Sequence, residues 1–187
     1  MDLLTKKTRL TDAEFELVKR HVEFSVEIME KSKGISGRAI EITRCHHERY
    51  NGKGYPRGLK ATQIPVFGRI GAIVDCYDAI TSERPYCKPL SSHDAIIKLY
   101  EWRNIDFQEG LVEGFIQCLG AFPTGSIVEL NSGAVGIVLS QNPVRRLRPK
   151  VMLILDENKK QYDNFPTIDL FHEISNMEKP LEIRRGH

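Results

Sequence analysis

The sequence contains no apolar run that approaches the roughly 18 residues of a membrane-spanning helix. Its first residues, MDLLTKKTRL, lack the apolar core of a signal peptide. An excess of one charge is also missing: 27 Lys and Arg stand against 25 Asp and Glu, a net charge of +2, which argues against bulk nucleic-acid binding. Cysteine is sparse, and no two of the four residues have CxxC spacing. They are Cys45, Cys76, Cys87 and Cys118. We therefore expect a cytoplasmic protein with free thiols and no membrane segment.

Hydrophobic patterning predicts a mainly α fold followed by a small antiparallel β extension. The chain has 187 residues, 41% of them hydrophobic and 28% charged, which fits one soluble domain with an appendage. Helices are expected over 11–30, 37–48, 65–82, 92–102 and 108–119, and strands over 126–130, 134–140 and 151–155. We place the domain boundary between 1–121 and 122–187. The polar stretch 156–187 is expected to be poorly ordered at its end.

The first expected helix, 11–30, has two apolar faces. It opens on a capping box in which Thr11 is the N-cap and Glu14 the third helical residue. One face carries Phe15, Val18, Val22, Val26 and Met29, and the second carries Leu17, Phe24 and Ile28. Only a helix covered on both sides needs this pattern. Without a segment that covers one of the faces, we expect exposed apolar surface and therefore a homo-oligomer.

Three histidines and two aspartates are candidate metal ligands. His46 and His47 are adjacent, so on a helix their side chains point about 100° apart and suit neighbouring ions better than one. Two core-edge histidines held by hydrogen bonds are the ordinary alternative, as is a satisfied core histidine for His21. Asp75 and Asp78 lie three residues apart on one helix surface, beside a stripe of small residues that lets a helix or a metal cluster approach. Imidazole with carboxylate suits Fe, Mn, Zn or Ni.

The run HHERYNGKGYPRGL, followed by Ile64-Pro65 and then GRIGAIVDCYDAITSERPY, resembles the HD-GYP family. Its members are bacterial metal-dependent phosphodiesterases of the HD superfamily that hydrolyse cyclic di-GMP. The resemblance covers about residues 5–120 and implies an HD-superfamily helical bundle. The later segments FPTGSIVEL, GIVLSQNP and RPKVML are similar to a small β extension that some members carry after this domain.

The resemblance assigns roles to individual residues. It implies metal ligands at His21, His46, His47 and Asp75, for a divalent ion such as Fe or Mn. A metal-activated hydroxide then attacks the phosphorus. It implies substrate-binding residues at Gly54, Tyr55, Pro56, Asp78, Arg84 and Lys88. The Gly-Tyr-Pro loop is also implicated in docking partner domains, such as one of the diguanylate cyclase type.

One part of the family pattern is missing from the sequence. The family is named for a His-Asp pair that precedes the helix of His21, and the 20 residues before His21 contain no histidine. The pair His93-Asp94 comes after the signature and fits a helix start capped by Ser91. The bundle is therefore expected to be incomplete, its metal site incomplete or empty, and the chain alone inactive. Either it is the C-terminal part of a longer phosphodiesterase, or it is a degenerate module that binds cyclic di-GMP or a signalling partner.

Smaller departures favour the second alternative. Asn51 stands where the family usually has Asp, and Cys87 stands where a basic residue is common. A third hypothesis gives the β extension a nucleic-acid role through the basic loop 145–150. One such loop without interleaved aromatic residues is weak support, because charged loops are usually just solvated.

Overall fold

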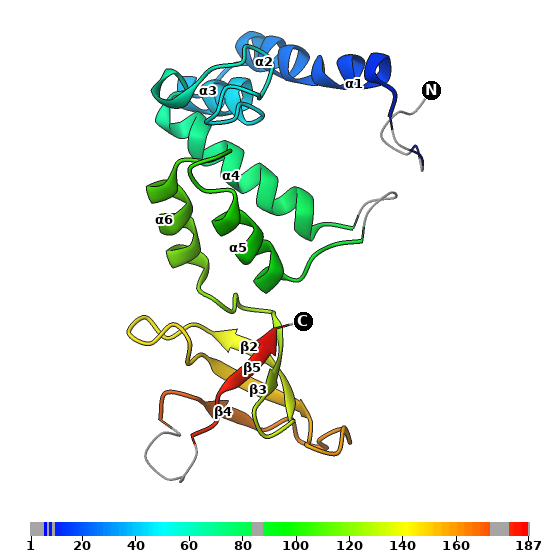
Figure 1. Ribbon diagram of the computed structural model, residues 1–187, viewed down its shortest axis with the longest axis vertical. Helices are drawn as coiled ribbons and strands as arrows, with labels where there is room; N and C mark the ends of the chain where they lie inside the picture. The colour runs from blue at the N-terminus through cyan, green and yellow to red at the C-terminus, as the bar shows by residue number, and fades with distance from the viewer. Residues whose placement is uncertain (1–5, 7, 9, 84–87, 173–179, 187) are drawn as a thin grey trace. The chain divides into compact units, whose positions relative to one another are not determined.

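The computed structural model describes residues 6, 8, 10–83, 88–172 and 180–186 (Figure 1). The chain divides into two compact units, Met1–Pro89 with Lys98–Glu113, and Leu90–Ile97 with Gly114–His187. The helices are α1 (Asp12–Lys19), α2 (His21–Lys31), α3 (Gly37–Cys45), α4 (Val66–Thr81), α5 (Ser92–Glu101) and α6 (Glu109–Leu119). The strands are β1 (Ile127–Leu130), β2 (Val135–Ser140), β3 (Lys150–Leu155), β4 (Thr167–Asp169) and β5 (Ile183–Gly186). The predicted fold class is confirmed, and the boundary at residue 121 stays a prediction.

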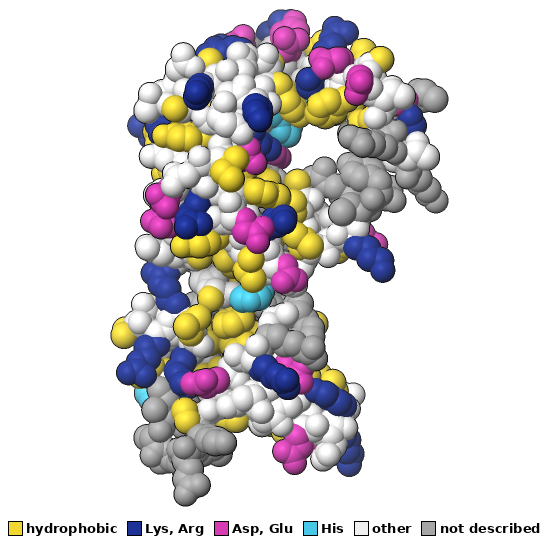
Figure 2. All heavy atoms as spheres, viewed as in Figure 1, with side chains coloured by type: hydrophobic (Ala, Val, Ile, Leu, Met, Phe, Trp, Pro, Cys, Tyr) yellow, Lys and Arg dark blue, Asp and Glu magenta, His cyan; other side chains and the backbone are white. Residues whose placement is uncertain are grey.

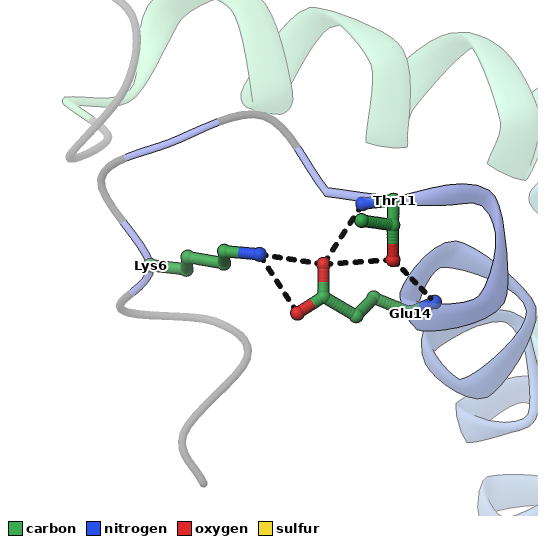
Figure 3. Close-up of polar contacts among 3 residues, drawn as sticks. All are labelled: Lys6, Thr11 and Glu14. Carbon is green, nitrogen blue, oxygen red and sulfur yellow. Dashed lines mark hydrogen bonds and ion pairs between the residues drawn. The ribbon is translucent and has the colours of Figure 1, made fainter.

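The capping box predicted at the start of α1 is present and is extended by a lysine. The Glu14 N–H donates to Thr11 Oγ1 over 3.3 Å, and the Thr11 N–H donates back to Glu14 Oε2 over 2.8 Å. Lys6 Nζ adds hydrogen bonds of 2.7 and 2.6 Å to the two carboxylate oxygens (Figure 3). The bonds between Thr11 and Glu14 satisfy N–H groups that a helix start otherwise leaves unpaired, and Lys6 pairs with the charge of the Glu14 carboxylate.

Replacing Lys6 with alanine is expected to raise the pKa of Glu14. The Lys6 ammonium and the Thr11 backbone lower the pKa of this carboxyl from 4.5 to about 2. Since the folded value is the lower one, the stabilisation is complete above pH 4.5 and is lost as the pH falls from 4.5 to about 2. Carbon-13 NMR of the Glu14 carboxyl in the wild type and in Lys6→Ala measures the shift. An unchanged pKa in the variant would assign the whole effect to Thr11.

The expected helix 11–30 is divided at Arg20. The Arg20 N–H donates to the Leu17 carbonyl three residues back, a tight turn of the 3-10 type, and α2 then begins at His21. Val22 and Val26 of the first apolar face are buried, as expected, whereas Phe15 of that face is exposed. The second face, Leu17, Phe24 and Ile28, is exposed, and apolar side chains appear in yellow over α1 and α2 in Figure 2. This exposure agrees with the expected uncovered surface, while the homo-oligomer stays a prediction.

Two glycines of α4 let α3 pack very closely against it. A Cβ at Gly68 would lie 2.5 Å from Cys45 Cβ, and one at Gly71 would lie 2.7 Å from Ile42 Cγ2. The small-residue stripe therefore receives a helix, which was one of its two predicted uses. Because α3 leads directly into His46 and α4 carries Asp75, this close packing brings the two candidate ligand segments together.

A five-stranded antiparallel sheet forms the core of the second unit, in the order β4-β3-β2-β1-β5 (yellow to red in Figure 1). Its buried core comes from alternate strand residues such as Val128, Leu130, Val138 and Val151. The three predicted strands are confirmed within one residue. The expectation of poor order towards the end of 156–187 is wrong for the described residues, because β4 and β5 lie there and β5 pairs with β1.

The other sequence features of this unit have structural roles. Asp94 N–H donates to Ser91 Oγ over 3.1 Å, as a helix start requires. His93 stacks on Phe122 with ring centroids 5.1 Å apart, and its Nδ1 lies 3.2 Å from the Ala121 carbonyl. In the basic loop, Arg148 is paired with Glu182 at 2.6 Å. This pairing reduces the charge that the loop offers to nucleic acid.

Two expectations about the whole chain can be compared with its described part. None of the helices described there combines the length and apolarity needed to cross a bilayer. Cys45, Cys76 and Cys118 are free thiols, and Cys87 lies outside the described residues. Burial raises the pKa of the Cys45 and Cys76 thiols, so neither is an activated nucleophile at neutral pH.

Candidate metal centre

His46 and His47 lie just beyond the end of a helix. The predicted helix 37–48 ends at Cys45, with His46 as its C-cap in a still helical conformation (φ −63°, ψ −18°). The chain then turns into the loop that contains Gly54, Tyr55 and Pro56. Because the helix ends here, the positions of the two imidazoles are determined by the helix cap and the following loop together.

His21 and His46 face each other through their Nε2 atoms, which are 3.4 Å apart. Each ring places its Nδ1 against a backbone carbonyl three residues earlier, at 2.7 Å from Val18 O and from Thr43 O respectively. Donation from Nδ1 leaves Nε2 of a neutral ring with a free lone pair. In that tautomer the two acceptors cannot satisfy each other, and two lone pairs at this spacing are what a shared cation would require.

His47 completes a cluster of three imidazoles. One ligand nitrogen from each of His21, His46 and His47 lies within 4.8 Å of the others. His47 Nδ1 is also 3.4 Å from Asp75 Oδ2, and the side chains of His47 and Asp75 are 19% and 34% exposed. The cluster is thus accessible at one side. The three histidines expected as ligands thus form one cluster, from α2 and the end of α3, and Asp75 of α4, the fourth expected ligand, lies beside His47.

Tyr55 lies directly on this cluster. Its ring centroid is 4.6 Å from that of His47 and 6.0 Å from that of Phe15, and its backbone N–H donates to the His47 carbonyl over 3.2 Å. Burial, with the Asp75 carboxylate, raises the pKa of Tyr55 to about 12. The phenol is therefore neutral at physiological pH and can donate a hydrogen bond at the site.

The other residues expected to bind substrate are not brought together as closely as the histidines. Pro56 and Asp78 are exposed, and Ser82 Oγ lies 3.4 Å from Asp78 Oδ1. Lys88 is exposed, and Arg84 lies outside the described residues. Gly54, by contrast, is pressed against the 47–49 backbone. A Cβ there would lie 2.3 Å from the Arg49 nitrogen.

The contacts of residue 51 explain why an asparagine fits this position. Its Oδ1 accepts the Lys53 N–H over 2.8 Å, which makes a side-chain turn, and its Nδ2 donates to Asp106 Oδ1 over 2.7 Å. An aspartate at this position cannot donate to Asp106 and would bring two carboxylates together. Asn51 therefore supports the loop and gives no argument for a degenerate site.

Sequence reasoning missed two residues beside the cluster. Glu48 falls within the predicted helix 37–48, but α3 ends at Cys45 and the Glu48 side chain is only 1% exposed. Lys19 Nζ lies 4.9 and 5.6 Å from the ring centroids of Phe15 and Tyr55 and pairs with Glu16 at 2.6 Å. The four-residue spacing between Phe15 and Lys19 could have indicated that the two side chains are neighbours on one helix face. Helical periodicity gave no indication that Glu48 is buried.

Comparison with known proteins gives two family matches. Residues 1–107 match the family described as HD domain, and residues 127–177 match a KOW domain associated with HD domain. The first match covers more than half of the chain.

Curated relatives extend this comparison. A cyclic di-GMP phosphodiesterase of Pseudomonas aeruginosa is 38% identical over 158 residues, which cover 84% of this chain and 38% of that protein. One of Thermotoga maritima is 37% identical over 116 residues, 62% of this chain and 32% of that protein. A 3′3′-cGAMP-specific phosphodiesterase of Vibrio cholerae is 37% identical over 112 residues, 59% of this chain and 22% of that protein. The chain thus spans less than half the length of these relatives.

Proposed function

Because the chain belongs to the HD-domain family, we propose that it supplies the metal-binding part of a metal-dependent phosphodiesterase of the HD-GYP class that hydrolyses cyclic di-GMP. The observation that carries this proposal is the cluster of His21, His46 and His47 with Asp75 beside it. The names of the relatives support the substrate, since those from Pseudomonas and Thermotoga are cyclic di-GMP phosphodiesterases.

The donor set fits a divalent transition metal. Three neutral imidazoles and one carboxylate suit Fe, Mn, Zn or Ni, whereas Mg or Ca prefer oxygen ligands alone. The Nδ1 bonds of His21 and His46 to backbone carbonyls fix the ring orientation that leaves Nε2 available. When bound, such an ion supplies Lewis-acid charge to phosphate oxygens and lowers the pKa of a coordinated water.

The chain's own residues would hold the dinucleotide against this centre. Tyr55 covers one side of His47 and offers a neutral phenol. Lys19 brings a positive charge over the Tyr55 ring, 5.6 Å from its centroid, where it can attract a phosphate oxygen. Arg84 and Lys88, from the segment after α4, remain proposed substrate residues by their place in the family signature.

The four ligands are enough for one ion, so we propose that this chain alone binds metal and cyclic di-GMP without hydrolysing the dinucleotide. The test is metal content by mass spectrometry together with chromatography of cyclic di-GMP after incubation with Mn²⁺ or Fe²⁺. It is applied to this chain and to the longest open reading frame that contains it. We expect about one ion and no linear product from the chain, and, if the reading frame encodes a longer protein, more ions with turnover from that protein.

Two outcomes would change this assignment. Turnover by the chain alone would refute its inactivity and leave the phosphodiesterase assignment in place. Cyclic di-GMP binding by both proteins without turnover in either would favour the second candidate, a non-catalytic module that senses the nucleotide. The ligand set, limited to one ion, is the observation that favours this alternative.

A further inference from the structure

Glu48 is a buried carboxylate whose two oxygens are both used by the Gly-Tyr-Pro loop. Oε1 accepts the Arg57 N–H and Oε2 accepts the Leu59 N–H, each over 2.9 Å. The side chain is 1% exposed. Both oxygens are therefore occupied as acceptors from backbone N–H groups. Glu48 is therefore not available as a metal ligand, and the metal-ligand cluster among the described residues contains only the three histidines.

Because Glu48 is buried, these two hydrogen bonds have a large effect on the position of the loop. An ionised carboxylate taken out of water is costly unless its oxygens are fully hydrogen-bonded. Charge-assisted bonds from backbone N–H groups are short and strong, and they also fix the position of the donating chain. The loop can leave its place only by exposing this buried charge, so Glu48 keeps the segment after Pro56 in one position.

That position determines where Tyr55 lies. The same turn holds the loop twice more: the Tyr55 N–H donates to the His47 carbonyl, and Gly54 packs on the 47–49 backbone. As a result the Tyr55 ring lies 4.6 Å from the His47 ring, at an interplanar angle of 34°. The loop therefore packs against the imidazole that faces Asp75, and a displaced loop would free this ring to rotate.

We propose that Glu48 is a positioning residue that holds the loop 54–59 on His47 and thereby fixes the geometry of the three histidines. The inference rests on the proposed metal centre, because it assigns Glu48 an effect on metal affinity through His47. Outer-shell partners of metal ligands typically change metal affinity by about 10–100-fold when they are replaced. The carboxylate thus couples the order of the loop to the binding of the ion.

The test compares Glu48→Gln and Glu48→Asp in the full chain. Glutamine keeps the shape but turns an amide NH₂ towards one backbone N–H, whereas aspartate keeps both acceptors on a shorter side chain. Glu27→Gln is the matched control, because Glu27 is exposed and pairs with Lys31 on the surface of α2. The readouts are Co²⁺ affinity by absorption titration and hydrogen exchange of the Arg57 and Leu59 amides.

We expect Glu48→Gln to lose protection at both amides and to bind Co²⁺ about 10–100-fold more weakly, with Glu48→Asp in between and Glu27→Gln unchanged. Unchanged Co²⁺ affinity in folded Glu48→Gln would overturn the proposal. If that variant does not fold, unchanged affinity in Glu48→Asp with lost amide protection would do the same. Absence of Co²⁺ binding in the wild type would instead refute the metal centre, while amide exchange would still decide whether Glu48 holds the loop.

Discussion

Replacing His46 with alanine is expected to abolish stoichiometric binding of a divalent metal by this chain. His46 Nε2 lies 3.4 Å from His21 Nε2, so its removal leaves His21 without the partner that defines the shared site. Loss of a direct ligand should exceed the effect of an outer-shell partner, which is about 10–100-fold, so we expect affinity to fall by more than about 100-fold. Mass spectrometry of metal content and Mn²⁺ titration by calorimetry measure the change.

A second histidine of the chain provides the matched control for His46. His172 belongs to the other unit, is largely exposed, and lies 3.9 Å from Asp169. His172→Ala therefore removes an imidazole without touching the cluster and should leave metal content unchanged. Equal loss of metal in both variants would mean that binding is non-specific. Full retention of metal in His46→Ala would place the ion elsewhere in the chain.

The helices and some of the candidate ligands could be predicted from local sequence patterns. The capping box at Thr11 and Glu14 and the apolar periodicity of the first two-thirds defined the helical elements. The adjacent pair His46-His47 was visible as a candidate from residue type alone, whereas its meeting with His21 and Asp75 was implied by the family signature. The glycine stripe of α4 explains physically why that meeting occurs.

The features that the sequence did not reveal depend on backbone partners distant along the chain. Glu48 has the pattern of a polar helix position, and its burial depends on two loop N–H groups that become its donors. Strand β5 is short and carries charged residues, so its strand character comes from pairing with β1 rather than from its own composition. The break at Arg20 has a local cause instead, a turn bond to Leu17 three residues back, which leaves the hydrophobic periodicity intact.

Gly54→Ala is expected to destabilise strongly the unit formed by 1–89 and 98–113, here called the helical unit, even though it adds only a methyl group. An added Cβ would lie 2.3 Å from the Arg49 nitrogen and 2.5 Å from both Glu48 Cα and the His47 carbonyl oxygen. These are backbone atoms, so no side-chain rotation relieves the overlap and the loop must move. Movement breaks the bonds to the buried Glu48 carboxylate, and we expect a cost of about 2–5 kcal/mol in free energy of unfolding.

The chain offers both a local probe and a matched control for this glycine. Trp102 is the single tryptophan and belongs to the helical unit, so its fluorescence during urea unfolding reports the stability of that unit. Gly110, in α6, has open space where a Cβ would be added, and Gly110→Ala should be neutral or stabilising by about 0.5–1 kcal/mol. Equal stability of Gly54→Ala and Gly110→Ala would show that the loop does not pack on the 47–49 backbone. Strong destabilisation of Gly54→Ala alone, with weakened metal binding under native conditions, would show that the loop and the histidine cluster form one structural unit.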